Sequence, residues 1–394
     1  MFNRDLRTAD HPALAAACRS SESVVPLFVI DPALTAGAGP NRVRFLVESL
    51  HALRTGLRDR GGNLVVRTGE PVDAAMQIAN EVGAERIFAS RDVSMHAQRR
   101  EQRLDAACRA SGRELALHPG VTVVDAGDLR PSGGGDHFRV FTPYWRKWLA
   151  TPWRAIVRAP ARVAMPSRIT VGRIPRVDDL TDRECSPECD IPGGERAAHQ
   201  RLSTWLDAPS DSPWDTSRLS AYLKFGCISP LQVAREVEAS GWSGSDDFVR
   251  SLCWRDFFHQ VVAAFPAMTT HDYRSNRKVR WRNDPEGFAA WCEGATGVPL
   301  VDAGMRQLLR EGWMPGRARL VAASYLSKSL RIDWRLGAAH FSEWLVDGDV
   351  PCNYGNWQWA AGTGNDTRPN RVLNPERQAA RFDPDGSYVE QWTA

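Results

Sequence analysis

The first third of the chain alternates short apolar runs with longer stretches of helical periodicity, and this alternation strongly restricts the possible folds. Residues 24–30 are predicted to be a buried strand, residues 41–60 a helix and residues 64–66 the next strand. Strands that alternate with helices pair in parallel, so residues 1–125 are predicted to form a doubly wound, Rossmann-like α/β domain, although the G-x-G-x-x-G fingerprint is absent. The other predicted elements of this domain are helix 71–82, strand 86–89, helix 97–110 and strand 121–124.

The rest of the chain has a different pattern. Residues 126–195 are rich in Pro, Gly and Arg, which predicts a long interdomain linker with one helix at about 144–149. Beyond residue 195 the β-branched runs disappear, so residues 196–394 are predicted to form an all-helical domain. Its predicted helices cover residues 229–240, 246–265, 285–292, 301–311, 317–330 and 338–345.

Composition excludes several classes of protein. Fifty basic and 47 acidic residues give a net charge of +3, so contact with nucleic acid must be local. The sequence has no apolar run long enough to span a membrane, and residues 1–7 lack the apolar core of a secretory signal, which predicts a cytoplasmic protein. The close pair Cys185 and Cys189 has no second pair at zinc spacing, so free thiols and no metal site are expected.

Tryptophan is concentrated in the second half, where twelve of the 15 residues lie beyond position 200. The segment 347–359 contains two of them. Pro351 fits the first turn of a helix, so Asn353 and Trp357 share one face, whereas Trp359 points roughly 200° away. An isolated pair of this kind is more often core packing than chemistry, but the surrounding motifs indicate otherwise.

Several ordered motifs together resemble the DNA photolyase and cryptochrome family, in particular the bacterial class I cyclobutane pyrimidine dimer photolyases. The resemblance covers essentially the whole chain. Its motifs are TSRLS at 216–220, WRDF at 254–257, GVPLVDAGMR at 297–306, GWM at 312–314, DWR at 333–335, DGD at 347–349 and NYGNWQW at 353–359.

The resemblance implies that the helical domain holds FAD, which absorbs blue light in its reduced form and passes an electron to a flipped-out thymine dimer. It also implies an antenna chromophore in the α/β domain, and the sequence does not distinguish a folate from a deazaflavin there. The expected partner is UV-damaged DNA, and the family is mostly monomeric.

The residues at 216–220 combine two hydroxyls, an arginine and backbone amides at a predicted helix start, which suits a phosphate group. A simple helix cap at Asp215 or Thr216 is the structural alternative. The resemblance implies that this stretch holds the FAD pyrophosphate, that Asn353 lies beside flavin N5 and that Asp347 pairs with Arg319. The full implied FAD set is Thr216, Ser217, Arg218, Leu219, Ser220, Arg255, Trp313, Arg319, Asp347, Gly348, Asp349 and Asn353.

The remaining functional residues are mostly aromatic. By resemblance, Trp357, Trp334 and Trp281 form the chain that passes electrons to the flavin. Trp254 and Trp359 match the walls of the dimer pocket, since aromatic stacking offsets the energy of base flipping. Arg317 and Arg371 are predicted contacts to DNA.

Three features depart from the family pattern. Ser251 stands where dimer photolyases usually carry a Glu that binds the dimer, and Pro315 and Gly316 replace His and Asn. The chain also begins at the family's RDLR motif, which predicts that the sheet lacks part of a central strand. Two rival functions remain open: a cryptochrome-like light sensor without repair, and a flavoprotein that binds DNA only structurally.

Overall fold

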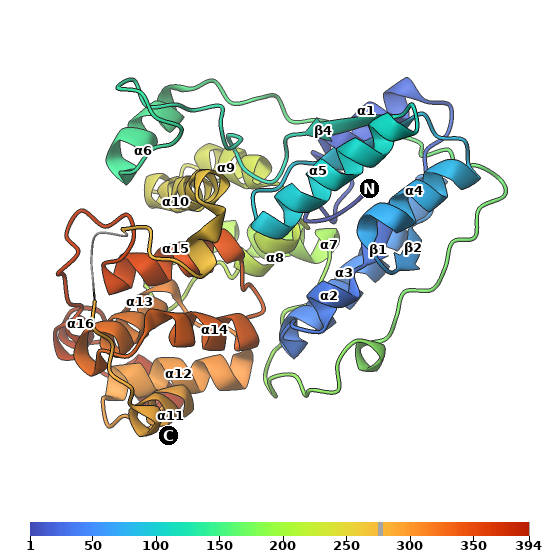
Figure 1. Ribbon diagram of the computed structural model, residues 1–394. Coiled ribbons are helices and arrows are strands. Elements are labelled where there is room, and N and C mark those ends of the chain that lie inside the picture. Colours follow the sequence, from blue (N-terminus) through green and yellow to red (C-terminus); the bar gives the residue numbers. More distant parts are fainter. Residues whose placement is uncertain (275–278, 394) are drawn as a thin grey trace.

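The computed structural model describes residues 1–274 and 279–393 and divides into an α/β lobe and a helical lobe (Figure 1). In the α/β lobe, strand β1 (Leu27–Ile30) pairs in parallel with β2 (Val65–Thr68), and β3 (Arg86–Ser90) pairs in parallel with β4 (Glu114–His118). The predicted α/β domain followed by a helical domain is therefore confirmed.

The N-terminal residues lie between these two small sheets. The Phe2 amide donates to Leu27 O at 2.7 Å, and the Met1 amino group donates to Phe88 O at 2.7 Å. Phe2 also forms an isolated parallel bridge with Phe28, so the residues at 1–2 take the place of a central strand. Residues 1–2 therefore lie between β1 and β3 and separate the two small sheets.

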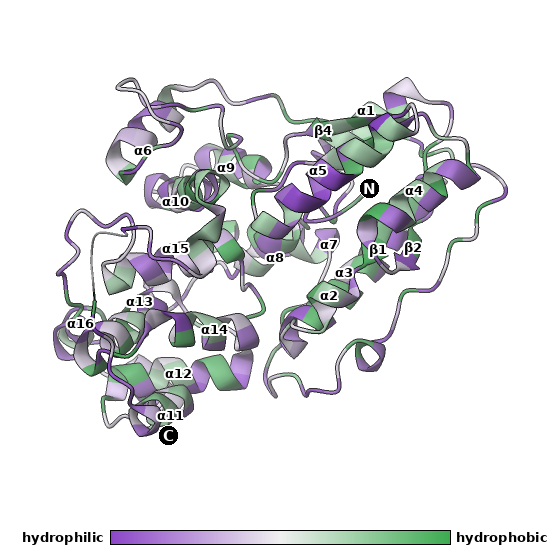
Figure 2. Ribbon diagram, in the orientation of Figure 1, coloured by the Kyte–Doolittle hydropathy of each residue, from purple (hydrophilic) through white to green (hydrophobic). Residues whose placement is uncertain are grey.

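The predicted helices of this lobe are present, and two more precede or follow β1. The sequence did not predict the nine-residue, Ala-rich helix near the N-terminus. The His11 ring caps this helix by accepting from Leu14 N at 3.1 Å. Figure 2 shows that the outer side of α5 (Met95–Ala110) is mostly hydrophilic. The helices are α1 (Pro12–Ser20), α2 (Pro32–Thr35), α3 (Pro40–Arg58), α4 (Pro71–Glu81) and α5 (Met95–Ala110).

The predicted strand at 121–124 is wrong, because the fourth strand is β4 and residues 121–124 are irregular. The backbone amides of Val123 and Val124 both donate to Asp256 Oδ2 at 3.0 Å. Val121 O accepts from Arg255 Nη1 at 2.6 Å. Side chains of the helical lobe therefore form hydrogen bonds with the backbone groups of residues 121–124, in place of the bonds that a neighbouring strand would form.

The linker contains the predicted helix, α6 (Phe141–Ala150), and a short turn, η1 (Val177–Asp179). Helix α6 packs against α10 (Ser245–Ala264) of the helical lobe (Figure 1). The rest of the linker follows the α/β lobe, since Val163 N donates to Arg60 O and Val66 N donates to Val171 O, each at 2.8 Å. The linker thus contacts both lobes.

The helical lobe contains every helix that the sequence predicted, and α8 begins at the predicted helix start at 216–220. Within the described residues it also contains α7, α16 and α17, which the sequence did not predict. The single helix expected at 317–330 is divided, because α13 ends at Ser324 and a π-helix continues to Leu330. The elements besides α10 are α7 (Glu195–Asp207), α8 (Ser220–Phe225), α9 (Pro230–Ala239), η2 (Pro266–Thr269), α11 (Pro285–Glu293), α12 (Pro299–Glu311), α13 (Gly316–Ser324), η3 (Tyr325–Leu330), α14 (Trp334–Trp344), α15 (Val350–Ala361), α16 (Pro375–Phe382) and α17 (Ser387–Thr393).

One apolar core joins the two lobes. The Phe45 ring of α3 lies 5.3 Å from Tyr222 and 4.9 Å from Phe225 of α8. Gly226 ends α8 with φ 68°, and a Cβ there would come within 2.0 Å of Arg4 O. This close approach holds the N-terminal segment against the start of the helical lobe. Among the described helices, none is long and apolar enough to cross a membrane.

Candidate functional site

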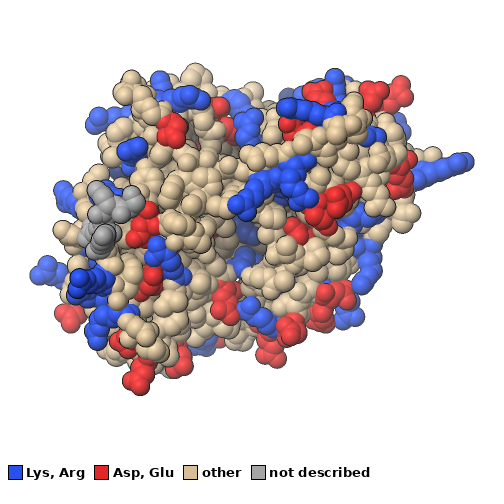
Figure 3. Space-filling model, in the orientation of Figure 1, with Lys and Arg blue, Asp and Glu red and all other residues tan. Residues whose placement is uncertain are grey.

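A cavity of about 880 Å³ opens in the helical lobe between α8, α10, α13 and α15. Most predicted site residues line it, whereas Trp334, Trp281 and Arg371 lie outside its wall. The molecular face in Figure 3 is hollowed between the lobes, with basic side chains at the edge of the hollow. The predicted residues in the cavity wall are Thr216, Ser217, Arg218, Leu219, Ser220, Ser251, Trp254, Arg255, Trp313, Arg317, Arg319, Asp347, Gly348, Asp349, Asn353, Trp357 and Trp359.

The stretch 216–220 forms the turn that leads into α8. Arg218 has a left-handed φ of 52°, and its Nη2 lies 3.1 Å from both carboxylate oxygens of Glu311. Its guanidinium also lies 4.5 Å from the centre of the Trp313 ring, and Trp313 Nε1 donates to Ser220 Oγ at 3.3 Å. These contacts fix the turn, so that its hydroxyls and amides line the cavity.

Asp347 and Arg319 form the ion pair that the sequence predicted. Arg319 Nη1 and Nη2 bind the two carboxylate oxygens of Asp347 at 3.0 and 2.8 Å, and Arg319 Nε donates to Met314 O at 2.8 Å. The Asp347 side chain is 2% exposed and that of Arg319 is 25% exposed. A bidentate pair compensates the buried carboxylate and gives the cavity wall a fixed shape.

Asn353 lies on the same helix as Trp357 and faces the cavity. Its Nδ2 donates to Ala338 O at 3.0 Å and to Ser342 Oγ at 2.8 Å. Both amide hydrogens are therefore committed to α14, which orients the side-chain carbonyl as an acceptor. An acceptor of this kind suits a ligand that presents an N–H group.

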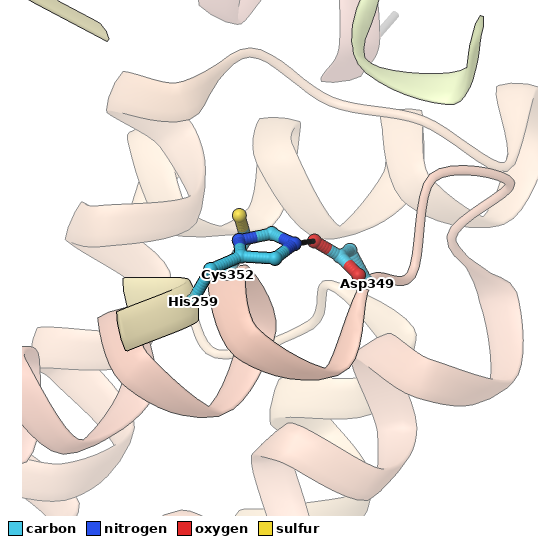
Figure 4. Close-up of side chains that lie close together, drawn as sticks. All are labelled: His259, Asp349 and Cys352. Atoms are coloured by element: carbon cyan, nitrogen blue, oxygen red, sulfur yellow. Dashed lines mark ion pairs between the residues drawn. The ribbon is translucent and has the colours of Figure 1, made fainter. Parts of the chain in front are cut away.

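Asp349 is the buried anion of a three-residue cluster with His259 and Cys352 (Figure 4). Arg4 Nη2 binds its Oδ1 at 2.5 Å, and His259 Nε2 lies 3.8 Å from its Oδ2. Burial alone would raise the pKa of Asp349, but Arg4 and then His259 outweigh burial and hold the pKa at about 2. Asp349 therefore carries a charge that Arg4 balances.

The same cluster has the residue types of a metal site, but the pKa of its thiol and the two arginines beside it do not favour metal binding. Burial raises the pKa of the Cys352 thiol well above its ordinary value. Burial and then Arg255 lower the pKa of His259 to about 3. A cation would need the thiolate form beside two arginines, so we assign Asp349 and Cys352 to the cavity wall and His259 to the buried layer behind it.

Three of the predicted tryptophans share one apolar cluster. Trp357 and Trp334 are buried, whereas Trp281 is half-buried against the same cluster. The Trp357 ring lies 4.9 Å from Phe341 and 5.9 Å from Trp291. Trp357 therefore lines the cavity wall, Trp334 lies in the core and Trp281 is partly accessible to solvent.

Two other tryptophans form apolar walls of the cavity. Trp254 stacks on Phe141 of the linker helix, with ring centres 3.6 Å apart and planes within 5°. The guanidinium of Arg371 lies 5.3 Å from the centre of the Trp359 ring, and that of Arg317 lies 4.2 Å from the Phe382 ring. Arg371 thus lies against one aromatic wall, whereas Arg317 lies against Phe382. Phe141 supports the Trp254 wall from outside the helical lobe.

Arg255 and Ser251 have specific structural partners. Arg255 lines the cavity, but its guanidinium donates to Val121 O at 2.6 Å and to Leu223 O at 3.3 Å, so it also joins the lobes. Ser251 Oγ donates to Asp247 O at 3.0 Å. Asp247 lines the cavity one helical turn before Ser251, and its spacing on α10 could have revealed it from sequence.

Comparison with known proteins identifies the family. Residues 1–164 match the family profile described as DNA photolyase, and residues 248–394 match the FAD binding domain of DNA photolyase. A deoxyribodipyrimidine photo-lyase of Streptomyces griseus is 47% identical over 408 residues, which cover 100% of this chain and 88% of that protein. The chain belongs to the DNA photolyase family. Its cofactor is FAD.

Other photolyase relatives agree with this result. A cryptochrome DASH of Natronomonas pharaonis is 34% identical over 99% of this chain and 88% of its own length. The crystal structure of a class III photolyase from Agrobacterium tumefaciens has a TM-score of 0.90 at 30% identity and covers 99% of this chain and 85% of that chain. An archaeal photolyase from Sulfolobus tokodaii, solved with two FAD molecules, has a TM-score of 0.86 at 30% identity over 99% and 88% of the two chains.

The cavity fits FAD in its chemistry. Its volume lies within the range typical of cofactor sites, and its wall is mostly apolar with a few fixed polar groups. The turn at 216–220 offers hydroxyls and amides to a phosphate, and Asn353 offers a carbonyl to an N–H group. The second carboxylate oxygen of Asp349, Oδ2, is buried without a hydrogen-bond partner among the described residues. Such an atom is typical of a site that a polar ligand completes.

Proposed function

We propose that this protein splits cyclobutane pyrimidine dimers in DNA in a light-dependent reaction with FAD. One observation carries the proposal. The cavity with the predicted flavin contacts, Arg319 and Asn353, is also walled by the two aromatic residues predicted to hold the dimer, Trp254 and Trp359. Cofactor and extruded bases would therefore share one cavity.

Bound FAD supplies the absorption of light and the electron for the reaction. The residues of the chain bind the cofactor and orient it. The turn at 216–220 would hold the pyrophosphate of FAD. The ion pair of Arg319 with Asp347 and the carbonyl of Asn353 would bind and orient the reactive end. No acid–base pair is needed in this scheme, because the electron itself breaks the dimer bonds.

The aromatic walls offset the energy of base flipping. Extruding a damaged pair requires a few kcal/mol, and stacking on an aromatic side chain returns about 1–3 kcal/mol per base. Trp254 is held rigid by Phe141 on one face, and Arg371 lies over Trp359. Both walls are therefore organised before DNA arrives.

The DNA backbone needs cations near this cavity. A second hollow of about 710 Å³ lies on the linker, lined by the glycines at 133–135 and by Arg139, Arg146 and Lys147. Phe141, which stacks on Trp254, belongs to the same helix as Arg146 and Lys147. We propose that the phosphates flanking the dimer reach these cations, together with Arg317 in the cavity wall and Arg371 over Trp359.

We further propose that the protein acts as a cytoplasmic monomer with an antenna chromophore in its α/β lobe, either a folate or a deazaflavin. All eight cysteines are unpaired, which suits a reducing compartment. Fluorescence of the chromophore released from purified protein would identify the antenna.

The test is repair of a single-stranded oligonucleotide with one thymine dimer, using flavin-reduced protein under blue light and a dark control. Recovery of thymine absorbance in the light alone is expected. Trp254→Leu should weaken dimer binding roughly tenfold or more. Trp344→Leu removes a half-buried indole outside the cavity wall and serves as the control. Failure of the parent protein to repair while it binds photoreducible FAD would refute the proposal.

A light-sensing role is the second candidate, because Ser251 and Gly316 replace two polar contacts of the family pattern. A neutral hydrogen bond contributes about 0.5–1.5 kcal/mol, against about 1.5–3 kcal/mol for a charged one. Ser251→Glu should therefore accelerate repair if the protein is a photolyase. Absence of repair in both forms would favour the sensor.

A further inference from the structure

The indole nitrogen of the middle tryptophan in the predicted electron chain donates a hydrogen bond to a carboxylate. Trp334 is fully buried, and its Nε1 donates to Asp272 Oδ1 at 3.0 Å. Asp272 lies in the segment after η2, so the contact spans 62 residues of sequence. The Asp272 side chain is 21% exposed, which places the carboxylate between the buried indole and solvent.

The first tryptophan differs in this respect. Trp357 Nε1 is buried and, within the part of the chain that the structure describes, has no hydrogen-bond acceptor. An oxidised Trp357 would therefore keep its indole proton. An oxidised Trp334 has a ready acceptor in Asp272, and loss of an electron from the ring makes the indole N–H far more acidic.

The charges around Trp334 favour loss of this proton. Arg335 lies 4.7 Å from the centre of the Trp334 ring and binds Asp272 Oδ1 at 2.8 Å. It also binds Asp333 Oδ1 at 3.0 Å, so two carboxylates share one guanidinium and leave one net negative charge beside the indole. A guanidinium over the ring opposes a second positive charge on it, and loss of the indole proton removes that repulsion.

We propose that Asp272 is the proton acceptor of oxidised Trp334, an inference that rests on the electron chain of Trp357, Trp334 and Trp281 predicted from the sequence. Trp334 gives one electron to oxidised Trp357, which becomes neutral again. The proton on Trp334 Nε1 then moves along the hydrogen bond to Asp272 Oδ1. The products are a neutral Trp334 radical and the protonated carboxyl of Asp272, so charge and atoms balance. When Trp281 later supplies an electron, the proton returns to the indole nitrogen.

This step keeps the transferred electron from returning. A neutral radical at Trp334 can take the electron back only together with its proton, whereas a radical cation needs the electron alone. Asp272 therefore prolongs the charge-separated state while the oxidised site is the buried Trp334, before the half-buried Trp281 donates its electron. Light-driven reduction of the cofactor should become more efficient as a result.

The experiment isolates the middle position. In a Trp281→Phe background the electron chain ends at Trp334, and a laser flash on protein loaded with oxidised FAD forms the tryptophan radical there. Transient absorption separates the neutral radical from the radical cation by their different bands. We expect mainly neutral radical in this background, formed more slowly in deuterated water because a proton moves.

Adding Asp272→Asn should lower the yield of neutral radical about tenfold, since a charged acceptor is replaced by a neutral one. Asp272→Glu retains a carboxylate and should restore part of the yield. Asp333→Asn is the matched control, because it removes a carboxylate from the same arginine but not from the indole nitrogen. The Trp334 indole N–H resonance of FAD-free protein checks that Asp272→Asn changes this hydrogen bond itself.

The outcomes are distinguishable. An unchanged yield of neutral radical after Asp272→Asn overturns the role of Asp272 and leaves the electron chain intact. Absence of any tryptophan radical in the Trp281→Phe background overturns the electron chain and this inference with it. Dimer repair, measured separately with chemically reduced protein, does not depend on either result.

Discussion

A glycine in α14 provides a quantitative test of the packing around Trp357. A Cβ at Gly337 would come within 2.2 Å of Trp357 Cη2 and 2.6 Å of Leu326 Cδ2. Both neighbours are buried, so neither side chain can move into solvent. Gly337→Ala therefore has to displace the indole or the helix that carries it.

Two effects with opposite signs determine the result. Alanine is favoured over glycine inside a helix by about 0.5–1 kcal/mol. Overpacking of a core destabilises by about 1–3 kcal/mol, and a clash with a rigid ring on one side and a leucine on the other lies near the upper end. We expect Gly337→Ala to lower the free energy of unfolding by about 2 kcal/mol.

The assay is urea unfolding of FAD-loaded protein, followed by the release of flavin fluorescence, with photoreduction of the cofactor as a second readout. Gly56→Ala in α3 is the control, because the nearest atom to its added Cβ is Thr8 Cγ2 at 3.8 Å. That variant should gain about 0.5–1 kcal/mol. If Gly337→Ala gained stability as Gly56→Ala does, the close packing on Trp357 would be refuted.

Three further predictions follow from single contacts. Arg319→Ala leaves the buried Asp347 carboxylate without its bidentate partner and should destabilise by about 3–5 kcal/mol, with loss of bound FAD on gel filtration as the measurement. Burial raises the pKa of Asp256 from 3.8 to about 7, so the folded state holds a proton that the unfolded chain releases, and stability falls as pH rises across this range. Asp256→Asn should remove this decrease in the free energy of unfolding, measured by urea titration at a series of pH values. If Asp256→Asn changed stability equally below pH 3.8 and above pH 7, the raised pKa of Asp256 would be contradicted. Trp357→Phe should abolish photoreduction of oxidised FAD under steady blue light, and unchanged photoreduction would exclude Trp357 from the electron chain.

Sequence patterns located most helices, because an amphipathic helix repeats its apolar face within a few residues. They failed where the local signal was weak or misleading. Helix α1 spans only nine residues, which is a short signal. The β-branched residues at 121–124 resemble a strand, although the amides of Val123 and Val124 bind Asp256. Asp247 could have been found from its spacing on α10, whereas nothing local indicates that Phe141 stacks on Trp254.

The sequence by itself determined the α/β and helical lobes, the family, the cofactor and the identities of the residues around it, because each motif is contiguous and acts within a few turns. The tertiary structure alone decided which of these residues meet. Arg4 binds Asp349 across 345 positions, and Asp272 binds Trp334 across 62. Such contacts depend on how the apolar cores bring distant segments together, and no local pattern records that packing.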